Sequence, residues 1–221
     1  MEFNFDFLSK YSNYFVVGTK TTLILALSAV IIGTILGLIL SLMKLSKFKV
    51  LKAIAVTYIE FVRGTPLLIQ IWIIYIGLPL VIGVDLPDIM TGIIALSLNS
   101  GAYVAEIIRA GIQAIDRGQM EAARSLGMKE GLAMREIIIP QAFKNILPAL
   151  GNEFISIIKE SSMVSVIGVA ELMYNTGTVR AASFIPFEPL IVAALIYFVI
   201  TFILTRIMGV VERRLKASDS R

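Results

Sequence analysis

Cysteine and histidine are both absent from the 221-residue sequence. Without cysteine, the chain has no disulfide framework and no thiolate metal site. Without histidine, it lacks the commonest metal ligand and the usual proton shuttle. An ordinary nucleophile–base pair cannot be assembled from the residues that remain. We therefore expect neither an enzyme active site nor a bound metal or cofactor.

The sequence also lacks a phosphate-binding loop of the form Gly-x-x-x-x-Gly-Lys-Ser/Thr. Any ATP chemistry associated with this chain must therefore come from another polypeptide. The formal net charge of +4 does not indicate a nucleic-acid partner, because the basic residues stand beside apolar segments. Orientation in a membrane explains that placement better.

Apolar residues dominate the chain. They make up 57% of the sequence, with a mean hydropathy of +0.85, whereas soluble domains are about half apolar. A membrane-spanning helix needs about 20 mostly apolar residues. The sequence predicts an all-α polytopic membrane protein with five transmembrane helices. The expected spans are residues 21–43, 54–78, 89–111, 146–167 and 184–205.

These spans divide the chain into three parts. Residues 1–20 are rich in aromatic side chains with scattered charge, which suits an external interfacial segment. Residues 21–205 form the transmembrane domain, whose polar loop covers 112–140, and residues 206–221 form a tail. The first apolar run is too long for the core of a signal peptide. We expect it to remain as a membrane helix.

Basic residues gather on one side of the predicted helices. Fourteen lie in the first loop between spans, in and beside the 112–140 loop, and in the tail. The other side has only Lys10, Lys20 and Arg180. Because positively charged loops stay in the cytoplasm, the N-terminus is expected outside and the C-terminus in the cytoplasm, together with the polar loop.

A short helix is expected inside this polar loop. Residues 118–126 are good helix formers, and Gly127 is a natural left-handed stop. Glu121 precedes two adjacent alanines, Ala122 and Ala123, which leave a bare helical surface for close approach by a partner. A short helix laid in a protein groove is a common recognition mode. The loop ends in Ile-Ile-Ile followed by Pro140.

The pattern Glu-Ala-Ala-x3-Gly-x9-Ile-x-x-Pro resembles the cytoplasmic loop of ATP-binding-cassette (ABC) importer permeases. Residues 61–68, 101–109 and 152–168 resemble the branch of that family that carries polar amino acids. Together the similarities cover most of residues 19–215. The resemblance implies a type I importer permease in which Glu121, Ala122, Ala123, Gly127 and Pro140 belong to the coupling helix region that contacts the ATPase.

Two carboxylates stand near the middle of the expected fourth span. Glu153 and Glu160 are seven residues apart, which places them on nearly the same helix face about 10 Å apart. Neither has a basic residue on its own face, since Lys159 points about 100° away from Glu160. Such a pair suits a cationic solute such as arginine, lysine or protonated histidine. Alternatively, Arg63 or a second copy's Lys159 pairs with one of them.

Other polar residues also interrupt the predicted spans. Asn99 and Ser100 lie near the middle of the third span, where polar groups either bond to a neighbouring helix or face a solute. Both are candidates for substrate contact. Pro66 and Pro148 are expected to break helices and free backbone groups that line a cavity or are capped by protein.

Two i,i+3 couples of opposite charge lie inside the spans. They are Glu60 with Arg63 and Glu106 with Arg109. Residues at this spacing share one helix face, so each couple is expected to neutralise itself and fix helix packing.

The resemblance also implies partners and a location. They are a second permease copy or relative, ABC ATPase subunits, an extracellular or periplasmic solute-binding protein and an amino-acid substrate, in a bacterial inner or cell membrane. Two readings of other classes remain open. One is an ion-coupled secondary carrier with Glu153 and Glu160 as proton sites, and the other is a membrane scaffold or sensor that transports nothing.

Overall fold

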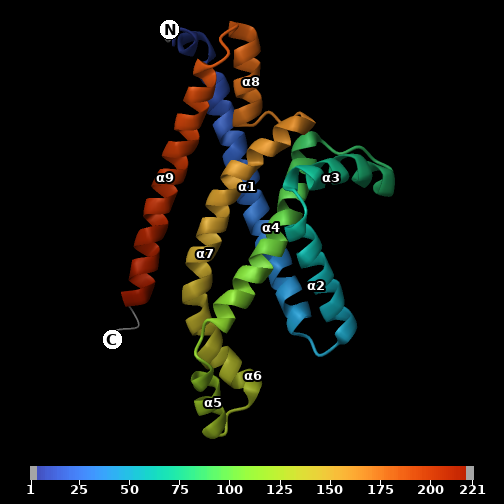
Figure 1. Cartoon of the computed structure of the whole chain (residues 1–221), viewed down its shortest axis with the longest axis vertical. Coiled ribbons are helices and arrows are strands. Elements are labelled where there is room, and N and C mark those ends of the chain that lie inside the picture. The colour runs from blue at the N-terminus through green and yellow to red at the C-terminus, as the bar shows by residue number, and fades with distance from the viewer. Residues whose placement is uncertain (1–3, 218–221) are drawn as a thin grey trace.

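The computed structural model describes residues 4–217, and every regular element in that range is helical (Figure 1). Arg221, counted among the basic residues of the tail, lies outside the described residues. The elements are α1 (Phe7–Leu45), α2 (Lys49–Gly64), α3 (Leu67–Ile82), α4 (Asp88–Gln113), α5 (Arg117–Ser125), α6 (Glu130–Ala133), the π-helical η1 (Met134–Ile138), α7 (Ile139–Glu160), the 3₁₀-helical η2 (Ser161–Ile167), α8 (Leu172–Ser183) and α9 (Glu188–Ala217).

Helix α1 is longer than the first predicted span. It begins at Phe7, so most of the expected interfacial segment continues into the helix without a break. Its N-terminal aromatic residues Phe7 and Phe15 are buried against α8 and α9. An interfacial role for residues 1–20 stays a prediction, although residues 7–20 are part of a continuous helix.

The expected second span, 54–78, is not one helix. Helices α2 and α3 meet at an angle of 113°. Proline disfavours a helical conformation in the residue before it, and Thr65 is accordingly extended, with φ −118° and ψ 146°. Pro66 therefore breaks the chain direction as expected, but the bend turns α3 sideways, away from the line of α2 (Figure 1).

The expected fourth span, 146–167, also differs from the structure. Helix α7 begins before it and ends at Glu160, after which the chain tightens into the 3₁₀-helix η2. Gly168 then terminates η2 with a left-handed φ of 90°. Pro148 lies inside α7 without ending it, so the predicted break at this proline is wrong.

The number of candidate spans is lower than predicted. Among the residues that the structure describes, three helices are long and apolar enough to cross a membrane, namely Phe7–Leu45, Asp88–Gln113 and Glu188–Leu215, and the bent pair α2–α3 makes up to four. Helix α7 falls short, because polar residues such as Lys144, Asn145 and Asn152 lower its hydropathy. The all-helical polytopic fold is confirmed, whereas five spans are not evident from length and composition alone.

Helices α1 and α4 pack along a seam of small residues. A methyl group added at Gly33 would lie 2.8 Å from the Ser100 Cβ, and one at Gly37 would lie 2.9 Å from the backbone nitrogen of Ala105. One turn further along, Ser41 donates its hydroxyl to the Ala105 carbonyl oxygen at 3.2 Å. Small residues let membrane helices approach this closely, so the seam fixes the relative position of the two helices.

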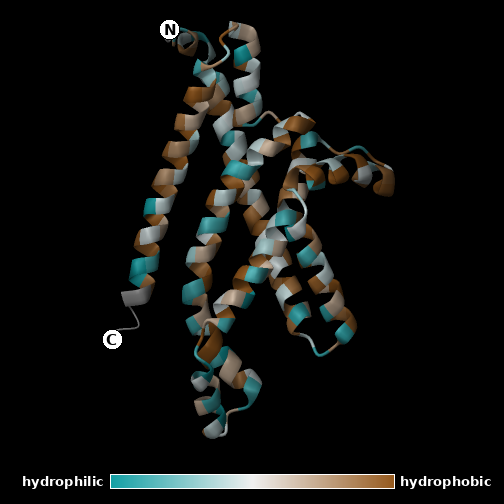
Figure 2. Cartoon of the chain, in the orientation of Figure 1, coloured by the Kyte–Doolittle hydropathy of each residue, from teal (hydrophilic) through white to brown (hydrophobic). Residues whose placement is uncertain are grey.

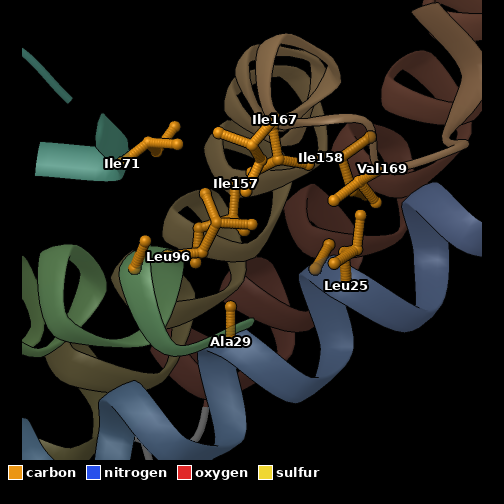
Figure 3. Packing of buried hydrophobic residues seen from close by; sticks show 11 residues of the cluster. Leu25, Ala29, Ile71, Leu96, Ile157, Ile158, Ile167 and Val169 are labelled. Atoms are coloured by element: carbon orange, nitrogen blue, oxygen red, sulfur yellow. The ribbon is translucent and has the colours of Figure 1, made fainter. Parts of the chain in front are cut away.

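The main apolar core lies where α1, α3, α4, α7 and η2 converge. Figure 3 shows its side chains pointing toward one another from these elements and from the segment that follows η2. The labelled members are Leu25, Ala29, Ile71, Leu96, Ile157, Ile158, Ile167 and Val169. This core holds α7, which carries Glu153 and Glu160, against α1 and α4.

Large apolar side chains cover much of the outer surface. Hydrophobic residues run along α9 and α3, whereas hydrophilic residues concentrate around α5 and α6 (Figure 2). Only 6% of the apolar window of α9 is buried inside the chain. Exposed apolar area on this scale indicates contact with lipid or other membrane helices.

We predict that Gly37→Ala destabilises the protein, because the added methyl group would meet the α4 backbone. Overpacking of this kind typically costs about 1–3 kcal/mol. Thermal unfolding of the purified complex measures the effect. Gly77→Ala is the control: the position is open, with nothing within 4 Å, so replacing a helical glycine there should leave stability unchanged or raise it. Equal unfolding temperatures for the two variants would contradict the seam.

Candidate functional site

The two carboxylates of α7 form no salt bridge with any side chain that the structure describes. Glu153 and Glu160 are both half-buried, and among residues 4–215 neither forms a salt bridge. They lie within electrostatic reach of each other. Lys159 is exposed beside Glu160, as the helical spacing predicts. Neither carboxylate therefore has a close ion-pair partner among the described residues, although Lys159 lies within electrostatic reach of Glu160.

Ser100 lies next to this pair. Its hydroxyl is near the Glu153 carboxylate but does not have the geometry of a hydrogen bond to it. The Ser100 side chain is 0% exposed and packs against Gly33 in the α1–α4 seam. It is therefore closed to a solute in this conformation, and its expected role in substrate contact stays a prediction.

Asn99 has a defined structural partner. Its amide nitrogen donates to Gln70 Oε1 at 2.9 Å, and the Gln70 Nε2 donates in turn to the carbonyl oxygens of Val62 at 2.7 Å and Thr65 at 3.0 Å. These are the carbonyls that the break at Pro66 leaves without helical donors. Asn99 is 5% exposed, so in this conformation it stabilises the α2–α3 bend and does not face an open cavity.

The Asn99–Gln70 contact shows which partner Asn99 has in this conformation. A polar residue inside a span bonds either to a neighbouring helix or to a solute, and here the neighbouring helix is α3. Sequence reasoning missed Gln70, although it is the polar side chain that follows Pro66 most closely in α3. Substrate contact by Asn99 stays a prediction.

A second charged cluster ties three helices together. Glu106 on α4 accepts from Lys44 Nζ of α1 at 2.6 Å and from Arg109 Nε at 2.9 Å. The Arg63 Nη1 of α2 lies 3.5 Å from the same carboxylate, and its guanidinium stands 5.6 Å from the ring centre of Tyr103. One carboxylate therefore faces three cations, which leaves a positive excess at this end of α4.

The expected Glu106–Arg109 couple is confirmed, but the Glu60–Arg63 couple is wrong. Arg63 turns to Glu106 on the neighbouring helix. Glu60 is exposed and forms no salt bridge among the described residues. The Glu106 side chain is only 16% exposed. An ion pair stabilises such a buried carboxylate more than it stabilises an exposed one such as Glu60.

The short helix of the polar loop forms as expected. Helix α5 covers Arg117–Ser125, and the Asp116 side chain caps it by accepting from the Gly118 N–H at 2.7 Å. Gly127 adopts a left-handed φ of 85°. The N–H of Met128 closes the turn on the Ala123 carbonyl at 3.1 Å. The predicted left-handed stop is therefore confirmed.

The two alanines of this helix face different ways. Ala123 is 2% exposed and faces the helices α6 and η1 that pack on α5, whereas Ala122 and Glu121 are exposed. Adjacent residues on a helix point about 100° apart, so both alanines cannot lie on one outer face. The expectation of a bare surface made by both is wrong: Ala122 contributes to the outer surface and Ala123 to internal packing.

The loop joins α7 through continuous helix. After α6 the chain passes through the π-helix η1 and enters α7, with Pro140 in the first turn. Proline is tolerated there because its missing N–H would lack a helical partner in any case. No flexible linker separates the loop from the helix that carries Glu153 and Glu160.

Comparison with known proteins identifies this arrangement. Residues 21–217 match the family of binding-protein-dependent transport system inner membrane components. An arginine transport system permease protein, ArtQ of Bacillus subtilis (strain 168), is 49% identical over 91% of this chain and 92% of its own. A putative glutamine transport system permease protein, GlnP of Rickettsia bellii (strain RML369-C), is 44% identical over 97% of this chain and 100% of its own.

A solved structure has a similar fold. The crystal structure of an amino acid ABC transporter with histidines contains a chain with 51% sequence identity and a TM-score of 0.93. The match covers 97% of this chain and 100% of that chain. The fold and the loop thus define a polytopic helical permease.

The protein belongs to the binding-protein-dependent transport system inner membrane components. It is the permease part of an ABC transporter, and ATP hydrolysis is carried out by a separate subunit. The ion-coupled carrier and the scaffold that transports nothing are therefore set aside.

We predict that Glu106→Gln destabilises the protein, because it leaves Lys44, Arg63 and Arg109 without their shared counter-charge. The loss should be about 2 kcal/mol, between the values typical of exposed and buried ion pairs. Glu60→Gln is the matched control, since Glu60 makes no ion pair among the described residues. The measurement is thermal unfolding of the purified complex. Equal unfolding temperatures for the two variants would show that the ion pairs of Glu106 do not stabilise the protein.

Proposed function

We propose that this chain is the transmembrane subunit of an ATP-driven importer of basic and polar amino acids, such as arginine, lysine or histidine. Its similarity to permeases named for arginine and glutamine transport, and to an amino acid transporter solved with histidines, supports this class of substrate. The family match supports dependence on an external solute-binding protein.

The observation that carries the substrate assignment is the pair of carboxylates on α7. Glu153 and Glu160 are half-buried, lie within electrostatic reach of each other and form no salt bridge among the described residues, while the exposed Lys159 lies within electrostatic reach of Glu160. Ionisable groups at membrane depth are costly and commonly mark the path of a substrate. In our proposal they hold the α-ammonium group and the side-chain cation of a basic amino acid. Ser100 stands beside Glu153, and in our proposal Asn99 and Ser100 contact the solute in another conformation of the transport cycle.

The proposed membrane arrangement has five crossings, and α7 with η2 makes the one whose helix falls short of a span by length and composition. Polar residues lower the hydropathy of a helix that lines a pathway, so α7 need not resemble a lipid-facing span. In Figure 1 the described N-terminal end lies at the top of the molecule, and α9 runs from that end toward the level at which α2 begins, on the side of α5. With the basic residues gathered toward α5, this supports an external N-terminus and a cytoplasmic C-terminus.

Five crossings do not easily enclose a pathway alone. The broad exposed apolar surface of α3, which includes Leu80 and Val81, supports association with a second permease, either identical or related. In this assembly, two ATPase subunits each receive one α5 as a coupling helix. Closure of the ATPases brings the two α5 helices together, and the membrane helices rock to switch access to the carboxylates.

The rigid route from loop to site supports this mechanism. Gly127 turns the chain after α5, and Pro140 begins α7 directly after η1. Movement of Glu121 and Ala122 at the ATPase surface is therefore transmitted through Ala123 and its helical neighbours. The same rigid body ends at the carboxylates.

Arginine uptake should depend on Glu153. We predict that Glu153→Gln lowers ATP-dependent uptake of labelled arginine by about tenfold or more, because a neutral amide cannot compensate the solute's charge. The measurement uses proteoliposomes that contain this chain with its co-purified ATPase and the cognate binding protein. Glu60→Gln, at an exposed glutamate without an ion pair, is the control.

Labelled glutamine, measured in the same vesicles, separates the two parts of the proposal. Glutamine uptake that requires ATP and ignores Glu153→Gln, without arginine uptake, would keep the importer and reject the cation site. Uptake of either amino acid without ATP would reject the importer.

A bulky residue on the outer face of α5 should uncouple the ATPase from transport. We predict that Ala122→Trp lowers uptake per ATP hydrolysed by about tenfold, equivalent to about 1.4 kcal/mol. Ala194→Trp places the same substitution on an exposed position of α9 and should leave the ratio unchanged. An unchanged ratio for both variants would contradict the role of α5 as the coupling helix.

A further inference from the structure

A basic cavity lies where three helices end, apart from the carboxylates on α7. It is lined by Lys44 and Leu45 at the end of α1, Lys52 in the first turn of α2, and Arg109, Ile112 and Gln113 at the end of α4. Its volume is about 210 Å³. The α1–α2 connection and the end of α4 lie toward the same end of the molecule as α5 (Figure 1).

The charges around this cavity do not balance. Lys44 and Arg109 share the carboxylate of Glu106, which also contacts Arg63. Lys52 is exposed and forms no salt bridge among residues 4–215. The Glu106 carboxylate is therefore outnumbered by the cations that contact it, and the cavity keeps a positive excess.

The backbone adds to this excess. Helix α2 begins beside the cavity after Phe48, and no side chain caps its first N–H groups. The N-terminal end of a helix carries partial positive charge and free donors. In combination with Lys52 in the same turn, these donors complement a group with several negatively charged oxygens, such as a phosphate.

Exposed apolar side chains lie close in the sequence to the residues that line the cavity. Leu45, Phe48 and Val50 are among the most exposed hydrophobic residues of this region, and Ile112 lines the cavity wall. A free phosphate ion would gain nothing from these residues. A phospholipid would place its phosphate against the lysines and its acyl chains against these apolar side chains.

We propose that this cavity, the basic pocket of Lys44, Lys52 and Arg109, binds the headgroup phosphate of an anionic phospholipid. The bound lipid supplies the negative charge that the Glu106 cluster lacks, and it holds the ends of α1, α2 and α4 together next to the coupling loop. Lys52 contacts the lipid phosphate in this proposal but takes no part in the ion pairs around Glu106, so replacing it should weaken lipid binding without destabilising the fold.

Lipid retention tests the proposal directly. The full chain, in complex with its ATPase, is reconstituted in vesicles of equal parts phosphatidylcholine and phosphatidylglycerol and then released into mild detergent. Native mass spectrometry counts the phosphatidylglycerol that stays bound. We expect Lys52→Gln to weaken retention about fivefold, as one lysine–headgroup contact implies, and Lys52→Arg to preserve it.

Lys47→Gln is the matched control, because Lys47 lies in the same basic segment but does not line the cavity. If the Lys47→Gln and Lys52→Gln variants lose equal amounts of bound phosphatidylglycerol, the effect is one of general surface charge and the proposal is overturned. Full retention of the lipid by Lys52→Gln would also overturn it. Binding of inorganic phosphate that depends on Lys52, with lipid retention that does not, would assign the cavity to a small free ion.

Discussion

The close approach of α1 and α4 determines where the rest of the chain lies. Helices in lipid gain no hydrophobic driving force from contact with each other, so they associate through close packing and polar contacts. Gly33 and Gly37 remove the side chains that would keep α1 away from α4. Ser41 then reaches an α4 carbonyl, and Lys44, about one turn later, reaches Glu106. The charged cluster is thus a consequence of the glycine seam.

Helix α4 connects this seam to the bend between α2 and α3. Asn99 and Ser100 are neighbours, but they point to different sides: Asn99 holds Gln70 at the bend, and Ser100 packs into the seam beside Glu153. Gln70 in turn satisfies the carbonyls that Pro66 leaves exposed. A change in the tilt of α4 would therefore reach the bend and the carboxylates together, as an alternating-access mechanism requires.

The sequence predicted what depends on local spacing and missed what depends on tertiary contact. The helix before Gly127 and the Glu106–Arg109 couple follow from the spacing of neighbouring residues, and both are present. Hydropathy cannot detect the 113° bend, because α2 and α3 taken together are apolar enough to read as a single span. The pairing of Arg63 depends on a residue of another helix, so the i,i+3 rule named the wrong partner.

The contrast between Glu106 and the α7 carboxylates bears on how solute binding and movement are linked. Glu106 is surrounded by three cations, and it stabilises the fold. Glu153 and Glu160 are half-buried and form no salt bridge among the described residues, although Lys159 lies within electrostatic reach of Glu160. Desolvating a carboxylate that lacks a bonded partner costs several kcal/mol. In the proposed importer a cationic amino acid removes that cost when it binds. The free energy recovered in this way would favour the conformation that encloses the solute, so recognition and closure would arise from the same two side chains.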